Sequence, residues 1–284
     1  MTDLTPLAAT AGPASLTYCD PAFPHRPLNL HAACPASWHP GMPVLFVHHG
    51  VTRNGRDYRD YWMPHVDRGG FLAIAIEFPH ASFPEHLWYN FGNLRAADGS
   101  ANPRRDWTFG IGARLFAAMR EQGLTTTRRY GLFGHSAGGQ FVHRMLSFGY
   151  RDQVAVAVGA NAGTYAMPDL SIDWPWGLGA TDLTPEDLPA LLRFPLIIMA
   201  GTEDTRTTGR YFPGGPKSLR QGATRHARAH SYLRAGRQAA ASLGIDLAWQ
   251  VIDVPGVGHD GRRMSEAAAP LIAEALQRRA HIPD

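Results

Sequence analysis

The stretch that decides the fold is RRYGLFGHSAGGQFVHRML, residues 128–146. Its first half is apolar and its second half has apolar residues at helical spacing, so we expect a buried strand over 129–136 and a helix over 138–148. Between them Ser136 stands between two nearby glycines. Glycines on both sides indicate a very sharp turn, at which neighbouring backbone leaves no room for side chains. Such a turn presents the serine hydroxyl at the start of a helix.

Alternating strand and helix patterns extend in both directions from this turn. Continuous apolar runs, typical of strands buried on both faces, occur at 43–50, 69–79, 153–161, 194–204 and 247–256. Helical spacing of apolar residues recurs at 108–122, 228–243 and 264–279. This alternation predicts an α/β fold with a mostly parallel central sheet and helices on both faces. Two short runs, 14–20 and 27–34, flank a proline-rich turn and predict antiparallel edge strands at the N-terminus.

We expect a single domain over residues 1–284, because the chain shows no internal repeat, low-complexity tract or linker. There is also no segment long enough for a large cap domain. Two long irregular stretches, 78–107 and 160–193, interrupt the alternation. Loops of this length in a compact domain usually act as lids or as walls of a binding pocket.

Composition places the chain among ordinary globular proteins. Of its residues 44% are apolar and 18% are charged, and the formal net charge is +3. The arginines form no dense basic block, which argues against nucleic-acid binding, and no apolar run approaches the roughly 18 residues of a membrane span. The first 20 residues lack the basic lead and apolar core of an export signal, so we expect a cytoplasmic protein. The sequence leaves open the oligomeric state, and whether Cys19 and Cys34 form a disulfide or remain free thiols.

Three residues have the types and positions needed for nucleophilic catalysis by serine. At a strand-to-helix junction of such a sheet, Gly-x-Ser-x-Gly is the nucleophile elbow, which makes Ser136 the candidate nucleophile. A serine hydroxyl needs a base, and the base needs an orienting acid. Asp204 ends the apolar run LIIMAGTED and is the candidate acid, with its neighbour Glu203 as the competitor. His259, in the glycine-rich loop VPGVGHDG just before the last helix, is the candidate base.

Acyl transfer also needs hydrogen-bond donors for the developing oxyanion. We expect one donor to be the backbone N–H of Ala137, directly after the candidate nucleophile. The second should lie in the loop VHHGVTRNG, where the N–H of Val51 is the first choice and that of Thr52 the second. No His-Glu-x-x-His or paired-cysteine spacing is present, so we expect neither a metal site nor a cofactor.

The motifs HHG, GHSAGG, GTED and GVGH follow one another in this order along the chain. With this combination the chain resembles the α/β-hydrolase superfamily over almost its whole length. More narrowly, HHGVTRNGRDY and GHSAGGQFVHRM make it similar to the poly(3-hydroxybutyrate) depolymerase, or LpqC-type, branch with its related feruloyl and acetylxylan esterases. The resemblance implies a serine esterase that cleaves carboxylic esters through an acyl-enzyme intermediate. Its substrate would be 3-hydroxybutyrate oligomers or polyester, or small aromatic or acyl esters; soluble substrates are favoured, because the polymer-binding modules of extracellular depolymerases are missing.

Both irregular stretches are rich in aromatic residues and follow the carboxyl ends of strands, where ligands bind in open α/β sheets. An aromatic cleft suits an uncharged ester. The candidate substrate contacts are Trp88, Tyr89, Trp107, Tyr165 and Trp176. Aromatic residues in long loops can instead simply attach the loop to the core, and this alternative stays open.

Two other functions are compatible with the same pattern. A serine peptidase of the oligopeptidase type uses the same triad, but it usually brings a propeller or cap domain for which this chain has no room. A non-catalytic binding protein on the hydrolase fold is the other alternative. Such a protein is expected to have lost at least one of Ser136, Asp204 and His259, whereas all three are present in order.

Overall fold

In the computed structural model, which describes residues 2–279, eight strands form one sheet in the order β1-β2-β4-β3-β5-β6-β7-β8. The strands are Gly12–Tyr18 (β1), Leu28–Cys34 (β2), Val44–His48 (β3), Leu72–Glu77 (β4), Tyr130–His135 (β5), Val154–Ala160 (β6), Leu196–Gly201 (β7) and Gln250–Val254 (β8). The pairs β1–β2 and β2–β4 are antiparallel, and the others are parallel. The predicted α/β fold with a mostly parallel sheet is therefore confirmed.

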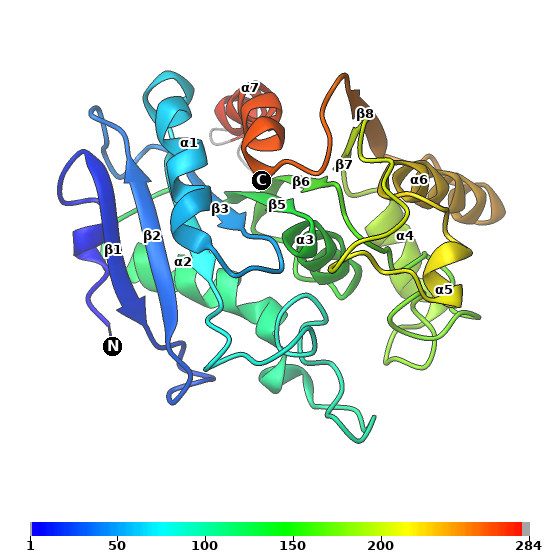
Figure 1. Ribbon diagram of the computed structural model, residues 1–284. Coiled ribbons are helices and arrows are strands. Elements are labelled where there is room, and N and C mark those ends of the chain that lie inside the picture. Colours follow the sequence, from blue (N-terminus) through cyan, green and yellow to red (C-terminus); the bar gives the residue numbers. More distant parts are fainter. Residues whose placement is uncertain (1, 280–284) are drawn as a thin grey trace.

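Helices cover both faces of this sheet (Figure 1). In the described part of the chain the α-helices are Gly55–Gly69 (α1), Ile111–Glu121 (α2), Ala137–Ser147 (α3), Leu188–Leu192 (α4), Pro216–Leu219 (α5), Arg225–Ser242 (α6) and Gly261–Arg279 (α7). Apolar side chains of α1 and α7 pack on one face, and those of α2, α3, α4 and α6 pack on the other. The strands between these layers are buried on both faces, which explains why β3, β5, β6 and β7 read as continuous apolar runs.

Helix α1 is an element that the sequence analysis did not predict. Its sequence, GRDYRDYWMPHVDRG, is rich in charge and contains a proline, so its helical pattern is weak. The buried residues Tyr58, Trp62 and Val66 recur at every fourth position and form the stripe that packs on the sheet. This narrow stripe was the signal present in the sequence.

The order of the strands indicates where a ligand site should lie. From β3 the chain passes through α1 to β4 on one side, and then through α2 to β5 on the other side of β3. Neighbouring loops diverge at such a switch point, and ligands bind there at the carboxyl ends of the strands. The loops after β3 and β5 therefore border a natural crevice.

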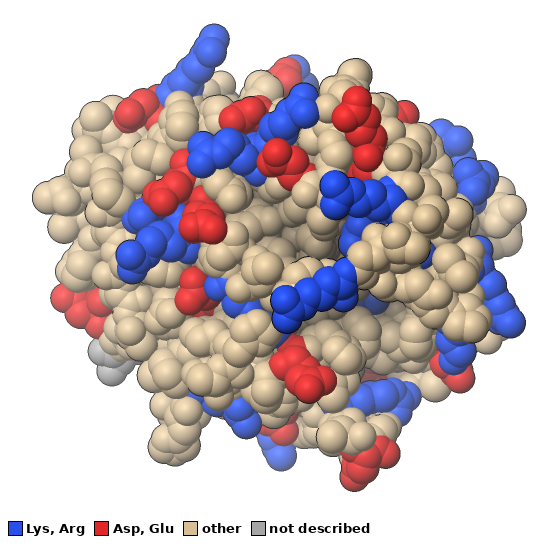
Figure 2. All heavy atoms as spheres, viewed as in Figure 1, with Lys and Arg blue, Asp and Glu red and all other residues tan. Residues whose placement is uncertain are grey.

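The fold also bears on the two cysteines, on membrane-spanning helices and on the distribution of surface charge. Cys34 lies opposite Gly12 at one end of the β1–β2 ladder, and Cys19 follows the other end of β1. Both are free cysteines, so the disulfide alternative is ruled out. Among the described residues, no helix has the length and apolar character needed to cross a membrane. Figure 2 shows basic and acidic side chains interspersed over one face of the molecule.

Candidate active site

Ser136 occupies the turn between β5 and α3 in an unusual backbone conformation. Its φ is 58° and its ψ is −114°. A positive φ in a residue other than glycine is strained and persists only where the surroundings enforce it. Here the Ser136 N–H donates a hydrogen bond of 2.9 Å to the carbonyl of Ala160 at the end of β6. The turn is thereby attached to the neighbouring strand.

Two glycines make this turn possible. A Cβ atom on Gly134 would lie 2.1 Å from the carbonyl oxygen of Gly138, and a Cβ atom on Gly138 would lie 2.1 Å from the carbonyl oxygen of His48. Both distances are far below van der Waals contact, and the opposing atoms are backbone atoms that cannot rotate away. The first turn of α3 thus packs directly against the end of β3, where the loop containing Val51 begins.

A chain of hydrogen bonds joins three of the predicted residues. Nε2 of His259 lies 2.9 Å from Oγ of Ser136, and Nδ1 of His259 lies 2.7 Å from Oδ2 of Asp204. Asp204 is buried, whereas the imidazole of His259 is partly exposed. Glu203 is exposed and takes no part in this chain of bonds, and its backbone N–H donates to the carbonyl of Val257. The geometry therefore brings Ser136, His259 and Asp204 together and leaves Glu203 out.

A cavity of about 290 Å³ opens beside Ser136. Residues of both long irregular stretches line it, among them Asn90 and Phe91 from the first and Thr164 and Trp176 from the second. Val51 and Ala137 line the same cavity, so the residues of the two predicted oxyanion donors border the space beside the serine. This arrangement suits a small carbonyl compound held against Ser136.

Comparison with solved structures identifies the family. The structure of LpqC, a poly(3-hydroxybutyrate) depolymerase from Bordetella parapertussis, matches with a TM-score of 0.89 and 38% identity, covering 97% of this chain and 92% of that one. Poly(aspartic acid) hydrolase-1 from Sphingomonas sp. KT-1 matches with a TM-score of 0.88 and 34% identity, covering 93% and 99%. The chain belongs to the α/β-hydrolase family. Within it, the chain falls in the branch that contains LpqC, and it is a serine ester hydrolase.

More distant structures share only the fold. S-formylglutathione hydrolase from Agrobacterium tumefaciens matches with a TM-score of 0.61 and 15% identity, covering 94% of this chain and 95% of that one. No family model and no curated protein matches the chain.

Asn161 is a residue of this hydrolase that the sequence analysis missed. Its Oδ1 accepts a hydrogen bond of 2.8 Å from the N–H of Gly201, and its Nδ2 donates one of 2.9 Å to the carbonyl of Gly258. Gly201 ends the strand before Asp204, and Gly258 precedes His259. One buried side chain therefore links the loop of the acid to the loop of the histidine.

Arg225 is a second missed residue. Its Nη1 lies 3.4 Å from Oδ1 of Asp204, the carboxylate oxygen that His259 does not contact. Burial lowers the pKa of the Arg225 guanidinium, and the nearby carboxylate of Asp204 opposes that effect. No spacing rule connects two residues that lie 21 positions apart on a loop and a helix, so the sequence held no signal for this pair.

The imidazole of His49 shapes the loop that carries Val51. Its Nε2 accepts the N–H of Phe78 at 3.1 Å, so its Nδ1 carries the proton and donates to the carbonyl of Gly50 at 2.8 Å. Burial lowers the pKa of His49 to about 3, which keeps the ring neutral. The hydroxyl of Tyr89 donates to the carbonyl of His49 at 2.7 Å. These bonds fix the backbone just before Val51.

Of the five aromatic residues predicted to contact substrate, Trp176 lines the cavity beside Ser136. The structure places the other four, Trp88, Tyr89, Trp107 and Tyr165, in aromatic clusters of the core or packed against it. Tyr89, Trp107 and Tyr165 are almost completely buried. For these residues the structure favours the alternative in which aromatic side chains attach long loops to the core.

The expectation that the chain has no metal site rested on missing spacing motifs. The described residues nevertheless include one group with a metal-binding set of donors, His226, His230 and Asp253, whose ligand atoms lie within 4.8 Å of one another. None of the three is among the residues that line the Ser136 cavity. The side-chain hydrogen bonds of this group are distinct from those that join Ser136, His259 and Asp204.

Proposed function

We propose that this hydrolase cleaves carboxylic esters through an acyl-enzyme formed on Ser136, with His259 as the general base and Asp204 as its orienting acid. The observation that carries the proposal is the continuous hydrogen-bonded chain from Oγ of Ser136 through His259 to the buried carboxylate of Asp204. The same hydrogen-bonded arrangement of nucleophile, base and acid recurs in serine hydrolases on unrelated folds.

The proposed reaction has two halves. His259 Nε2 takes the proton of Ser136 as Oγ attacks the ester carbonyl, and the resulting oxyanion accepts hydrogen bonds from the N–H groups of Val51 and Ala137. The protonated imidazole then gives its proton to the leaving alcohol, which departs and leaves the acyl group on Ser136. In the second half, water loses a proton to His259 as it attacks the acyl carbonyl. The bond between the acyl carbon and Ser136 Oγ then breaks, Oγ takes the proton back from His259, and the carboxylic acid is released. Asp204 holds the Nδ1–H of His259 throughout.

The lining and the volume of the Ser136 cavity favour a substrate with an uncharged acyl group of modest size. Phe91, Trp176 and Phe212 contribute apolar surface, and a volume of about 290 Å³ is at the lower end of ordinary ligand sites. Small acyl or aromatic esters and 3-hydroxybutyrate oligomers fit this description. The likeness to LpqC, a poly(3-hydroxybutyrate) depolymerase, supports the oligomers in particular.

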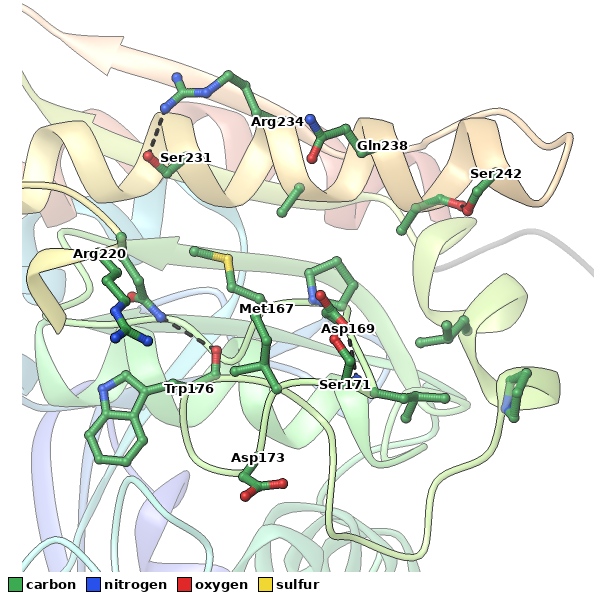
Figure 3. A pocket seen from close by; sticks show the side chains of 18 of the residues that line it. Met167, Asp169, Ser171, Asp173, Trp176, Arg220, Ser231, Arg234, Gln238 and Ser242 are labelled. Atoms are coloured by element: carbon green, nitrogen blue, oxygen red, sulfur yellow. Dashed lines mark hydrogen bonds between the residues drawn. The ribbon is translucent and has the colours of Figure 1, made fainter. Parts of the chain in front are cut away.

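A second candidate is the amide bond of poly(aspartic acid), supported by the likeness to poly(aspartic acid) hydrolase-1. A larger cavity of about 910 Å³ is shown in Figure 3, and Trp176 lines both this cavity and the one beside Ser136. Three cations line this larger cavity, Lys217, Arg220 and Arg234, together with the carboxylates of Asp169 and Asp173. A net excess of positive charge there would attract an anionic chain leaving the active site.

We propose that the hydrolase works as a single domain, with the stretches 78–107 and 160–193 forming pocket walls through the residues that line the cavity. It needs no cofactor for this chemistry and no nucleic-acid partner. Its cytoplasmic location remains a prediction.

A panel of substrates tests the proposal. Wild-type enzyme is assayed with p-nitrophenyl esters of graded chain length, feruloyl esters, 3-hydroxybutyrate oligomers and poly(aspartic acid). We expect ester hydrolysis, and a loss of about a million-fold in kcat for Ser136→Ala with an almost unchanged Tm. Activity of this variant within tenfold of wild type would refute the role of Ser136, and faster cleavage of poly(aspartic acid) than of every ester would favour the second candidate.

A further inference from the structure

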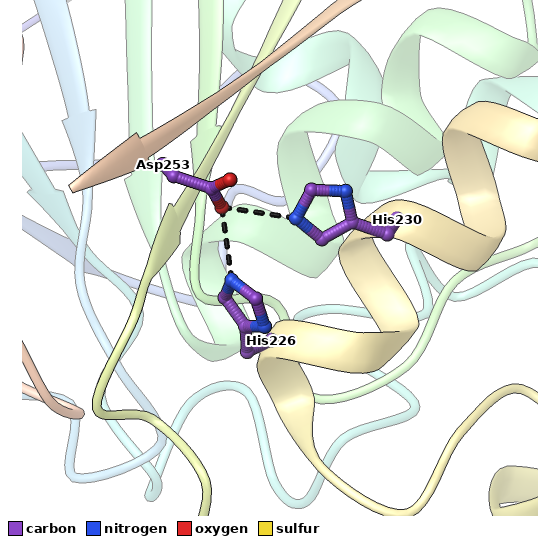
Figure 4. A group of neighbouring side chains, drawn as sticks. All are labelled: His226, His230 and Asp253. Carbon is purple, nitrogen blue, oxygen red and sulfur yellow. Dashed lines mark hydrogen bonds and ion pairs between the residues drawn. The ribbon is translucent and has the colours of Figure 1, made fainter. Parts of the chain in front are cut away.

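Two histidines and an aspartate converge at the edge of the sheet, beyond the cavity of Ser136. His226 and His230 lie one turn apart on α6, and Asp253 lies on β8, the last strand of the sheet. The Nε2 atoms of both imidazoles are 2.9 Å from the same oxygen, Oδ1 of Asp253 (Figure 4). Residues four apart on a helix share one face, which is why both rings point toward the strand.

We propose that His226, His230 and Asp253 bind one divalent transition-metal ion of the Zn²⁺ class. A tetrahedral zinc ion with ligands at about 2.0–2.1 Å needs its ligand atoms roughly 3.3 Å apart. The three ligand atoms here lie within 4.8 Å of one another, two of the pairs at 2.9 Å. Small side-chain rotations therefore suffice to place an ion between them.

The donor set and the exposure of the group define the kind of ion. Two imidazoles and one carboxylate match the borderline ligands that Zn²⁺ and its neighbours prefer, whereas Ca²⁺ and Mg²⁺ prefer all-oxygen sites. The side chains of His226, His230 and Asp253 are 28%, 33% and 44% exposed. This exposure leaves a fourth coordination position accessible to water, as well as a path for the ion to enter.

The site would act on the stability of the loop that holds Asp204. Helix α6 begins at Arg225, which contacts the Asp204 carboxylate, and the N–H of His226 donates to the Asp204 carbonyl at 3.3 Å. An ion shared by the first turns of α6 and by β8 would hold the helix start in place. Because a metal that binds only the native state stabilises it by mass action, Zn²⁺ should raise the Tm.

Zinc binding by the metal-free, full-length protein tests this proposal. The protein is stripped with a chelator, exchanged into chelator-free buffer and titrated with ZnCl₂ in a calorimeter, while Tm is measured with and without Zn²⁺. We expect one Zn²⁺ per chain at this site and a higher Tm. His230→Ala and Asp253→Asn should each weaken binding by more than the roughly 10–100-fold typical of losing a partner in the outer shell of a metal site.

Two variants control for the other histidines. His80→Ala removes an exposed histidine elsewhere on the surface, and His259→Ala removes the imidazole paired with Asp204. Both should bind Zn²⁺ at the α6–β8 site as wild type does. Equal affinity in His230→Ala and wild type, loss of binding only in His259→Ala, or no binding of Zn²⁺ by wild type below millimolar concentration would each overturn the proposal. The near-isosteric His230→Gln repeats the test if His230→Ala fails to fold.

Discussion

The guanidinium of Arg225 lies against the carboxylate oxygen of Asp204 that His259 leaves free, with Nη1 and Oδ1 3.4 Å apart. Asp204 therefore has a cationic partner on one side and the imidazole on the other, while its side chain is fully buried. Burying a carboxylate without such partners is costly. The guanidinium of Arg225 thus offsets part of the cost of burying the Asp204 carboxylate.

We predict that Arg225→Met weakens both the fold and the reaction. Removing one partner of a buried ion pair leaves an uncompensated charge, which should lower the free energy of unfolding by about 3 kcal/mol. A looser Asp204 should also lower kcat by about tenfold, equivalent to about 1.4 kcal/mol of transition-state stabilisation. Urea unfolding and steady-state kinetics measure the two effects. The exposed Arg206 gives the control, and an Arg206→Met variant as impaired as Arg225→Met would argue against the pairing.

Replacing each of the two neighbouring carboxylates by its amide shows which one is the acid that orients His259. Asp204→Asn should lower kcat by up to about 10⁴, because the amide cannot stabilise the imidazolium and can favour the wrong tautomer. Glu203→Gln should change kcat little, since Glu203 is exposed and outside the hydrogen-bonded chain. The values of kcat for the two variants on one ester decide the matter. The opposite ranking would assign the acid to Glu203.

The contact between α3 and β3 makes Gly138 intolerant of a side chain. In Gly138→Ala the new Cβ would start 2.1 Å from the His48 carbonyl oxygen, so the elbow must shift. We expect a loss of about 1–3 kcal/mol in unfolding free energy or more, and a large loss of kcat as Ser136 moves. Gly112 lies inside α2, and the atoms nearest to a Cβ added there are 3.8 Å away, which is ordinary contact. Gly112→Ala should therefore be neutral or stabilising by up to about 1 kcal/mol. Similar behaviour of the two variants in thermal unfolding would contradict the steric argument.

Two tryptophans distinguish a pocket wall from a core contact. Trp176→Ala should raise KM by about tenfold, about 1.4 kcal/mol of binding, because its ring lines the Ser136 cavity. Trp107→Ala should instead cost about 3–5 kcal/mol of stability and leave KM nearly unchanged, because its ring packs in the core against Phe148. Kinetics on one ester and denaturant unfolding measure both. If Trp107→Ala changed KM as much as Trp176→Ala, the division of the aromatic residues would be wrong.

Glu77 should make the stability of the protein depend on pH in acid. Burial alone would raise the pKa of its carboxyl, but His31, the amide of Asn29 and the N–H of Gly55 at the start of α1 together lower that pKa to about 2. A carboxyl with a depressed pKa stabilises the fold above its unfolded pKa of about 4.3, and this contribution disappears as the pH falls toward about 2.

Glu77→Gln should therefore be less stable than wild type at pH 7, by on the order of 3 kcal/mol. The difference should shrink steadily as the pH is lowered from about 4.5 toward 2. Urea midpoints over this pH range test the expectation. Glu266→Gln, which changes an exposed carboxyl on α7, is the control. A difference between Glu77→Gln and wild type that stays constant across the range would show that the carboxyl is not responsible.

The sequence by itself determined the features that depend only on residues close together along the chain. Continuous apolar runs predicted β3 to β8. For β3 to β7 the reason is that strands buried on both faces have no polar side, whereas β8 is an edge strand and is only partly buried. The glycines around Ser136 predicted the sharp turn, because a turn that leaves no space for side chains requires glycine at positions close to it in the sequence. His259 and Asp204 were chosen as candidates in the same way, each from a short loop at the end of a predicted strand, and their side chains do meet in the structure.

Only the tertiary structure decided which distant side chains meet. The ion pair of Arg225 with Asp204, the bridge made by Asn161 and the convergence of His226 and His230 on Asp253 each join separate loops, helices or strands. The aromatic residues show the same limit. Trp176 and Trp107 are chemically alike and both lie in long irregular stretches, yet one lines the cavity and the other fills the core. Burial is a property of the packed chain, and no local pattern specifies which side of a loop faces the core.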